Sequence, residues 1–500
     1  MDSEKVIQDL NQRFAQSLPE FYKRRIIFWC DEEREFENKL DEIVLRDAKL
    51  IALTGTNYFA VKKLLGVEDP TGNYVVYCPL SYEKPEDDWL LDIRLYSEEY
   101  RADLISNWMD EMGLPQTAAL RKQVKEYRKF FKAAVRREKI AKQKNIPSVP
   151  RQLDMAVMGA LSGIVDVTPY AIIKKVLCAG LDTGTNSMYC GFADYGIDKA
   201  FWNMVQKGTG YVADIPNLGH LAAHILLTSA TRTMQLEYLS KWKDFVSEAH
   251  QAYCYDFVSE WLHSTDADQL REIVIRIEEE LKLSEQFMKL DVADLVNTET
   301  FPCIHELILI KLMTEIADSI IDVNIIRETV EKRRTCVWYE EVKDFYEGIL
   351  QVANMQDFFK EHTTGFHSAQ AVRVWKEYTT EYYKMDTYYR LFHRSYGRSL
   401  KTYHAKLHDL FSHIMEKAEG LYKNWFLGQL GENWSKVCAE EIERYGKILE
   451  VPQQEEFYKS KVKNADNRVF VIISDALRYE VAADLADQLR RETKSQVDLS

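Results

Sequence analysis

Paired cysteines and long apolar runs are both missing from this sequence. Its eight cysteines are spread over 500 residues, and no two of them form a Cys-x-x-Cys pair. This spacing excludes the usual zinc clasp and gives no sign of a disulfide framework. No segment approaches the roughly 18 consecutive apolar residues that a membrane-spanning helix requires. The N-terminal Met-Asp-Ser-Glu-Lys-Val lacks the pattern of a secretory signal. We therefore predict a cytosolic protein with reduced thiols and no membrane partner.

Glycine and proline are scarce in the middle of the chain. No glycine lies between Gly219 and Gly348, and no proline lies between Pro302 and Pro452. Because both residues interrupt helices, their absence permits long uninterrupted ones. Apolar residues in this region recur at three- and four-residue spacing, with charged residues between them. We predict a large helical domain at 116–450, built from long helices packed on one another.

The first 115 residues have a different pattern. Short segments rich in β-branched and aromatic residues predict three strands, at 24–30, 49–54 and 74–78. Helical patterns at 35–45 and 58–65 separate these segments. Alternating strands and helices of these lengths are typical of a parallel sheet. Residues 1–115 are therefore predicted to form a small α/β, Rossmann-like domain.

Two short segments of this domain are candidate ligand sites. Acids follow the first predicted strand, at Asp31, Glu32, Glu33 and Glu35. They suit a metal, but acids in the first turn of a helix also stabilise its dipole. The segment 54–57 follows the second strand and contains one glycine, whereas phosphate-binding loops need two or three. We favour a helix start and a simple turn.

Residues 121–144, the basic stretch, are strongly cationic in an otherwise acidic protein. They contain eleven Lys or Arg against two Glu, whereas the whole chain has a formal net charge of −14. Apolar residues at helical spacing predict one packed helix with a cationic outer face. Such a face suits phosphates or an acidic partner, but it also suits a solvated surface that balances acids elsewhere. The candidates for a nucleic-acid or acidic-partner patch are Arg121, Lys122, Lys125, Arg128, Lys129, Lys132, Arg136 and Arg137.

Histidine pairs at four-residue spacing occur twice. His404 and His408, and likewise His220 and His224, would share one face of a helix, as metal-binding pairs do. No carboxylate or cysteine joins either pair at a suitable offset. Structural histidines are therefore the favoured interpretation of both pairs.

Residues 468–500 return to an α/β pattern. The segment 469–474 is apolar and β-branched, as in a strand buried on both faces, and 476–491 has helical spacing. Asp475 lies between them. A carboxylate at the carboxyl end of a buried strand lies where open α/β sheets bind ligands, but Asp is also a favoured helix N-cap. The local pattern leaves both interpretations open.

One strand and one helix cannot bury their apolar faces alone. Residues 496–500, Gln-Val-Asp-Leu-Ser, have the pattern of the beginning of another strand. Either this piece adds to the N-terminal sheet, or the natural protein continues beyond Ser500 and completes a sheet of its own. We favour the second alternative.

Separate motifs at the two ends of the chain resemble one family. Val-Phe-Val-Ile-Ile-Ser-Asp-Ala-Leu-Arg-Tyr-Glu at 469–480 is similar to the opening of the PglZ domain, which belongs to the alkaline phosphatase superfamily. Near the N-terminus, three segments resemble the start of type A PglZ proteins of bacterial BREX phage-defence systems: Arg25-Ile-Ile-Phe-Trp-Cys-Asp31, Asn57-Tyr-Phe-Ala-Val-Lys-Lys-Leu64 and Trp89-Leu-Leu-Asp-Ile-Arg-Leu-Tyr96. The resemblance makes the chain the N-terminal portion of such a protein, with the phosphatase-like domain beginning at 468–500.

The resemblance implies a role for Asp475. In this superfamily, the Asp that ends the first strand ligates one metal of a two-metal site, and a Ser or Thr nucleophile attacks phosphorus. The nucleophile and the other ligands are expected beyond Ser500, because Thr493, Ser495 and Ser500 follow Asp475 too closely. A divalent metal, Zn or Mn, is therefore expected only in the full-length protein. This chain alone is expected to bind none and to be inactive.

The resemblance also implies partners in the bacterial cytoplasm. We expect a docking platform for other BREX components, namely BrxB, the methyltransferase PglX and the ATPase BrxC. The alternative is a nucleic-acid-binding module that binds DNA through the basic stretch. A third hypothesis is a complete enzyme with its site near Asp31 or at His404 and His408.

Overall fold

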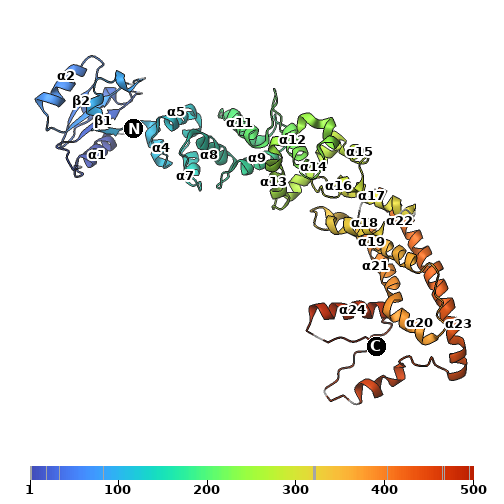
Figure 1. Ribbon diagram of the computed structural model, residues 1–500. Helices are drawn as coiled ribbons and strands as arrows, with labels where there is room; N and C mark the ends of the chain where they lie inside the picture. The colour runs from blue at the N-terminus through green and yellow to red at the C-terminus, as the bar shows by residue number, and fades with distance from the viewer. Residues whose placement is uncertain are drawn as a thin grey trace. The chain divides into compact units, whose positions relative to one another are not determined.

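The computed structural model describes residues 3–18, 20–32, 34–80, 82, 84–318, 322–402, 404–463, 465–466, 468–494 and 496–499. The chain divides into two compact units, Met1–Leu221 and Ala222–Ser500. The described residues are mostly helical, and they include a small parallel sheet in the first unit (Figure 1). The predicted combination of a parallel sheet and a mainly helical remainder is therefore confirmed. The predicted domain boundaries stay predictions.

The sheet has four parallel strands in the order β2-β3-β1-β4. Three of them confirm the predicted strands: β1 (Ile26–Cys30), β2 (Lys49–Ala52) and β3 (Tyr74–Cys78). The edge strand β4 (Glu98–Tyr100) was not predicted, because its three residues, Glu-Glu-Tyr, have no apolar pattern. Strand β4 is held by its pairing with β1. This pairing joins segments far apart in the chain, so the local sequence contains no pattern that predicts it.

Both faces of the sheet are covered. Trp29 of β1 faces a core that includes α1 (Ser3–Phe14), whereas Phe28 faces a core that includes α2 (Tyr58–Lys63). Every residue of β1 and β3 is buried as a result. Two-sided burial explains why both strands have unbroken apolar sequences.

Asp31 fixes the chain where it leaves β1. Its carboxylate is 1% exposed and accepts hydrogen bonds from the backbone N–H groups of Glu35 at 3.1 Å and Phe36 at 2.9 Å. The Tyr77 hydroxyl donates a third bond at 2.7 Å. Burial and the nearby Asp31 carboxylate raise the pKa of Tyr77. Asp31 is therefore a fully engaged structural residue.

The helix predicted at 35–45 is shorter than expected. A 3-10 helix, η1, spans Glu37–Glu42, and the backbone turns extended at Ile43. Val44, which a helix over 35–45 would place on the same side as Phe36 and Leu40, is 73% exposed because it follows this turn.

The rest of the first unit is helical. Its helices are α3 (Leu91–Arg94), α4 (Leu104–Glu111), α5 (Ala118–Glu126), α6 (Arg128–Phe131), α7 (Ala134–Ala141), α8 (Pro150–Ser162), α9 (Pro169–Cys178), α10 (Ser187–Asp194) and α11 (Asp198–Thr209), and α12 (Leu218–Ala230) follows.

The single helix predicted for the basic stretch is wrong. It is three short helices, α5, α6 and α7, interrupted at Tyr127 and at Ala133, which is extended. These interruptions bury Phe130 and Phe131 completely and leave Val135 65% exposed. The tertiary gain from burying two aromatic rings therefore outweighs the helical spacing of the segment.

Long helices dominate the second unit, as predicted. After α12 come α13 (Gln251–Leu262), α14 (Ala267–Leu281), α15 (Leu283–Phe287), α16 (Val292–Leu295), α17 (Cys303–Ala317), α18 (Val323–Arg333), α19 (Tyr339–Glu361), α20 (Ala371–Glu377), α21 (Tyr383–Ser399), α22 (Ala405–Glu419), α23 (Gly428–Tyr445) and α24 (Tyr479–Glu492). Two π-helical segments, η6 (Tyr378–Tyr382) and η7 (Gly420–Leu427), join α20 to α21 and α22 to α23. Among the described residues, no helix has the length and apolarity needed to cross a membrane.

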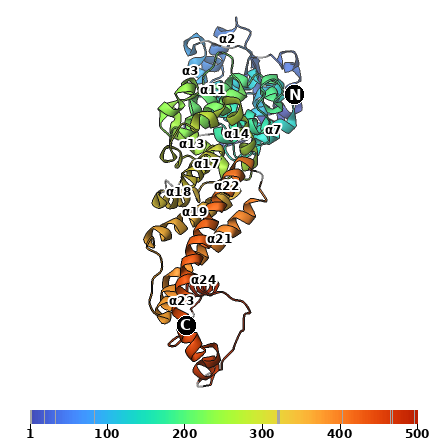
Figure 2. The same cartoon turned by 90° about the vertical axis from the view of Figure 1, so that its right-hand side faces the viewer.

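Helices α19, α21 and α22 pack alongside one another (Figure 2). Gly348 of α19 lies against Phe411 of α22, because a Cβ atom at position 348 would overlap Cζ of Phe411. Phe411 is fully buried and packs on Phe345 with ring centroids 5.2 Å apart, so it has no room to move away. Glycine at 348 therefore sets the spacing of these two helices.

We predict that Gly348→Ala destabilises the second unit by roughly 1–3 kcal/mol, because the steric overlap exceeds the gain in helix propensity. Gly397→Ala in α21 is the matched control, since an added Cβ there meets no atom within 4 Å. It should stabilise by up to about 1 kcal/mol. Denaturant unfolding of the two variants measures both values, and equal effects would contradict the packing argument.

Candidate functional site

The segment before Asp475 is extended and exposed. Phe470 is 80% exposed, Ile472 91% and Ile473 90%. No described residue pairs with this segment as a strand. The strand predicted at 469–474 is therefore not formed here, because a parallel strand needs hydrogen-bonded neighbours on which to bury its side chains.

Asp475 itself is exposed, and it does not cap the following helix. The helix predicted at 476–491 is present as α24 (Tyr479–Glu492), whose N-cap position is Arg478. Between the two, Ala476 has a positive φ of 57°, which turns the chain away from a helical path. The N-cap interpretation of Asp475 is therefore wrong.

The residues that follow Asp475 in the motif attach α24 to α21. The Tyr479 hydroxyl donates a hydrogen bond of 2.9 Å to the carbonyl of Thr379, and its ring packs edge-on against Tyr383 at 5.4 Å. Tyr479 thus anchors the first turn of α24 to the helical body of the second unit.

A buried carboxylate strengthens this attachment. Glu480 is 1% exposed, and its carboxylate pairs with the Arg478 guanidinium and lies 3.9 Å from Nε of Arg390 on α21. Arg390 also donates to the Asp484 carboxylate at 3.2 Å, one turn further along α24. A buried charge is costly unless it is paired, so Arg390 is the residue of α21 that places positive charge near both acids of α24.

Asp386 lies on α21, one turn before Arg390, and joins three helical segments. It accepts hydrogen bonds from the hydroxyls of Tyr378 in η6 at 2.7 Å and Tyr422 in η7. Burial raises the pKa of its carboxyl, although both tyrosines stabilise the charged form. This network makes the surface that receives α24 rigid.

Two arginines of the basic stretch are buried in ion pairs. Arg121 donates to the carboxylate of Asp103, which also caps α4, and to the hydroxyl of Ser106. Burial alone would raise the pKa of Asp103, but the hydrogen bond and charge of Arg121 hold it below its usual value. Arg137 pairs with Glu111 at 2.6 Å and donates to the carbonyl of Phe131.

Three further cations of the patch contact protein groups. Lys129 donates to the carbonyl of Asp194 at 2.8 Å, and the Arg136 guanidinium lies 4.5 Å from the ring centroid of Tyr195. Lys125 lies 3.9 Å from a carboxylate oxygen of Glu32.

Lys122, Arg128 and Lys132 are exposed, and so is Lys129 apart from its hydrogen bond. The residues predicted as one patch are thus divided between the interior and the surface.

The other candidate sites are also separated or engaged. Glu32 pairs with Arg101 at 2.9 Å, Glu35 is exposed, and Glu33 lies outside the described residues. His404 precedes α22 and lies 3.0 Å from Glu306, whereas Nε2 of His408 bonds the carbonyl of Thr402. His224 is buried, and both it and His220 make contacts with other residues. Within the described part of the chain, no three His, Cys, Asp or Glu side chains are arranged to hold a metal.

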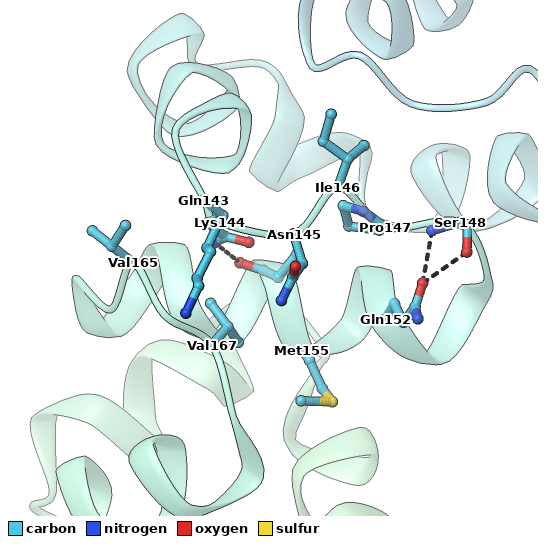
Figure 3. Close-up of a pocket in the computed structure, with 11 residues that line it drawn as sticks. Gln143, Lys144, Asn145, Ile146, Pro147, Ser148, Gln152, Met155, Val165 and Val167 are labelled. Atoms are coloured by element: carbon cyan, nitrogen blue, oxygen red, sulfur yellow. Dashed lines mark hydrogen bonds between the residues drawn. The ribbon is translucent and has the colours of Figure 1, made fainter.

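A cavity of about 650 Å³ lies between the loop 143–148, α8 and residues 165–167 (Figure 3). Gln152 accepts hydrogen bonds from the backbone N–H of Ser148 at 2.8 Å and from its hydroxyl at 3.0 Å. Lys144 pairs with Asp166 at 3.0 Å. Because its described lining includes no acid, histidine or cysteine, this cavity has no acid–base pair for catalysis.

We predict that Arg121→Ala destabilises the first unit by about 3–5 kcal/mol, because the buried Asp103 carboxylate loses its partner. Lys122→Ala is the control at the adjacent, exposed position and should change stability by at most about 0.5 kcal/mol. Thermal or denaturant unfolding measures the difference. Similar values for the two variants would show that Arg121 has no structural role.

We predict that Arg390→Ala loosens α24, because Glu480 and Asp484 each lose a partner. Amide exchange within α24 should accelerate by roughly 10- to 100-fold, while exchange in α19 stays unchanged. Arg394→Ala, one turn further along α21 at an exposed position, is the matched control. Unchanged exchange in the Arg390 variant would show that α24 is held by other contacts.

Comparisons with known proteins agree with both motifs. Residues 455–500 match the family model described as the BREX system PglZ alkaline phosphatase-like domain. The chain is 30% identical over 504 residues to the alkaline phosphatase-like protein PglZ of Bacillus cereus (strain H3081.97), covering 100% of this chain and 58% of that protein. It is 26% identical over 527 residues to the alkaline phosphatase-like protein BrxZ of Escherichia coli O9:H4 (strain HS), covering 98% of this chain and 58% of that protein.

The chain therefore spans less than two thirds of the length of these curated relatives. No solved structure matches it significantly. The resemblance predicted from the motifs at the two ends is confirmed: the chain is similar along its whole length to alkaline phosphatase-like proteins named PglZ and BrxZ, and residues 455–500 match the BREX system PglZ domain.

Proposed function

We propose that this chain is the non-catalytic N-terminal part of a metal-dependent phosphohydrolase in a BREX defence system, and that it docks other BREX proteins. The extent of the matches carries this proposal. Both relatives align with 98% or more of the chain, whereas the phosphatase-like family model matches only from residue 455. Residues before 455 therefore resemble the relatives but lie outside the segment that matches the phosphatase-like family model. A binding role accounts for such a region.

Asp475 is the proposed contribution of this chain to a phosphatase-like metal site. The superfamily resemblance assigns it one ligand position for Zn or Mn in the longer protein. A single exposed carboxylate does not fit a metal pair, which requires several ligands. No catalytic step therefore follows from the described residues of this chain alone.

The attachment of α24 supports a link between the two roles. Tyr479 and Glu480 follow Asp475 closely and contact the helical body through Thr379 and Arg390. A partner that binds the helical segments around Thr379 and Arg390 would therefore also affect α24, whose first residues belong to the motif. We propose that docking and the position of Asp475 are coupled through α24.

Nucleic-acid binding through the basic stretch is the alternative proposal. Lys122, Arg128, Lys129 and Lys132 are the exposed residues of the patch. Because Lys129 already donates to the carbonyl of Asp194, the other three are the proposed phosphate contacts. The formal net charge of −14 opposes non-specific binding, so the contact would be local. If it exists, charge reversal at these three residues should abolish DNA retention at physiological salt.

Docking is tested by pull-down with this chain as bait. Purified BrxB, PglX and BrxC are offered separately, and we expect at least one of them to be retained. Retention of none contradicts the docking proposal. Phosphodiesterase activity in this chain alone, with added Zn²⁺ or Mn²⁺, would contradict its non-catalytic assignment.

We predict that Asp475→Asn lowers phosphodiesterase activity of a polypeptide extended to the full length of the relatives by at least about 100-fold, because a metal ligand is lost. Bound metal, measured by elemental analysis, should fall in parallel. Asp487→Asn, at an exposed position on α24, is the control and should retain both activity and metal. Full metal content in the Asp475 variant would show that this residue is not a ligand.

A further inference from the structure

A second cleft of the first unit lies between α8 and α11, which are labelled in Figure 1. Its volume is about 340 Å³. Ligand pockets typically measure about 300–1,000 Å³, so this cleft is large enough for one small ligand. Sequence patterns did not reveal it, because its walls come from segments more than 30 residues apart.

Three cations surround this cleft. Lys199 and Lys207 lie eight residues apart on α11 with Asn203 midway, so all three share one helix face. Arg151 lies opposite, on α8. None of these three cations forms an ion pair with any residue that the structure describes, in contrast to Arg121. The cleft lining holds these three cations against one acid, Asp154, and this excess of positive charge attracts an anion.

The interior of the cleft is apolar and sulfur-rich. Met155 and Met158 of α8 and Met204 of α11 line it. Met158 is 1% exposed and Met204 5%, so both form the floor. Methionine side chains are polarisable and contact aromatic rings favourably. The floor therefore suits a flat aromatic group better than a second charged group.

One hydrogen-bond acceptor also lies in the cleft. Asp154 lines it, and Oδ1 of Asp154 accepts bonds from the Tyr127 hydroxyl at 2.6 Å and from the Gln123 amide. Both bonds go to the same oxygen, which leaves Oδ2 able to accept from a ligand. A carboxylate recognises an exocyclic amino group in this way.

The basic stretch supports one wall of the cleft. Gly196 lines the cleft and has a positive φ of 73°, which reverses the chain between α10 and α11. Lys129 and Arg136 contact Asp194 and Tyr195, immediately before this turn. Lys129 and Arg136 of the basic stretch thus help to fix the shape of the cleft, although they do not line it.

We propose that this cleft binds a nucleotide unit. The phosphate lies among Arg151, Lys199 and Lys207, the base lies on the methionine floor, and an exocyclic amino group donates to Asp154. An acidic peptide would pair with the cations, but it would not supply a flat aromatic group for the methionine floor or an amino group for Oδ2 of Asp154. A free nucleotide and one residue of a single-stranded nucleic acid share the required chemistry. The proposal does not depend on docking or on the metal site.

Titration of the purified chain, without metal, tests the proposal. The probes are inorganic phosphate, AMP and a five-residue oligoadenylate, with binding measured by calorimetry. We expect AMP or the oligonucleotide to bind at least about 10-fold more tightly than phosphate, because the floor and Asp154 contribute. The double variant Lys199→Gln/Lys207→Gln should weaken this binding by roughly 10- to 100-fold.

The control variant Lys23→Gln/Lys175→Gln removes the same charge from exposed positions outside both the cleft and the basic stretch. It should change affinity by less than about twofold. Preference for AMP identifies a free nucleotide as the source, and a preference for the oligonucleotide that weakens with salt identifies a single strand. The proposal is overturned if neither binds more tightly than phosphate, or if the two double variants lose affinity equally. Retention of BREX partners by the cleft variant separates this site from docking.

Discussion

The structure of the second unit around the family motif depends on one buried charge. Glu480 is almost completely enclosed, and it is tolerated there because the guanidinium groups of Arg478 and Arg390 both lie near its Oε1. Through Arg390, the motif that contains Asp475 is fixed to α21, and through Asp386 the same helix is fixed to η6 and η7. If this charge were unpaired, α24 would be held mainly by Tyr479 and by its buried Ala483 and Ala486, since Leu485 and Leu489 are exposed.

The same principle operates in the first unit, where arginine acts mainly as a structural residue. Arg121 and Arg137 connect α5 and α7 to the two ends of α4 by pairing with Asp103 and Glu111. A planar guanidinium supplies several donors in fixed directions, so one side chain satisfies a carboxylate and a neighbouring oxygen together. Cationic composition in a short segment is therefore a poor measure of the charge that reaches the surface.

This division of roles has a functional consequence. The cations that a composition argument selects are partly used to build the first unit, while Arg151, Lys199 and Lys207, which composition does not select, are left facing a cleft. The exposed motif at Asp475 and the cleft between α8 and α11 lie in different units. Binding at one is therefore separable by experiment from binding at the other.

Sequence alone determined much of the architecture. Unbroken apolar segments located β1, β2 and β3, the lack of glycine and proline indicated the long helices of the second unit, and the segment 469–480 identified the family. These features are local, because a strand buried on both faces or an uninterrupted helix leaves its pattern in consecutive residues.

Tertiary structure decided the rest. It placed β4 beside β1, divided the basic stretch into three helices and buried Arg121 while exposing the adjacent Lys122. It also brought Arg151 to the same cleft as Lys199. Each of these outcomes depends on partners far away in the chain, and local spacing contains no record of them.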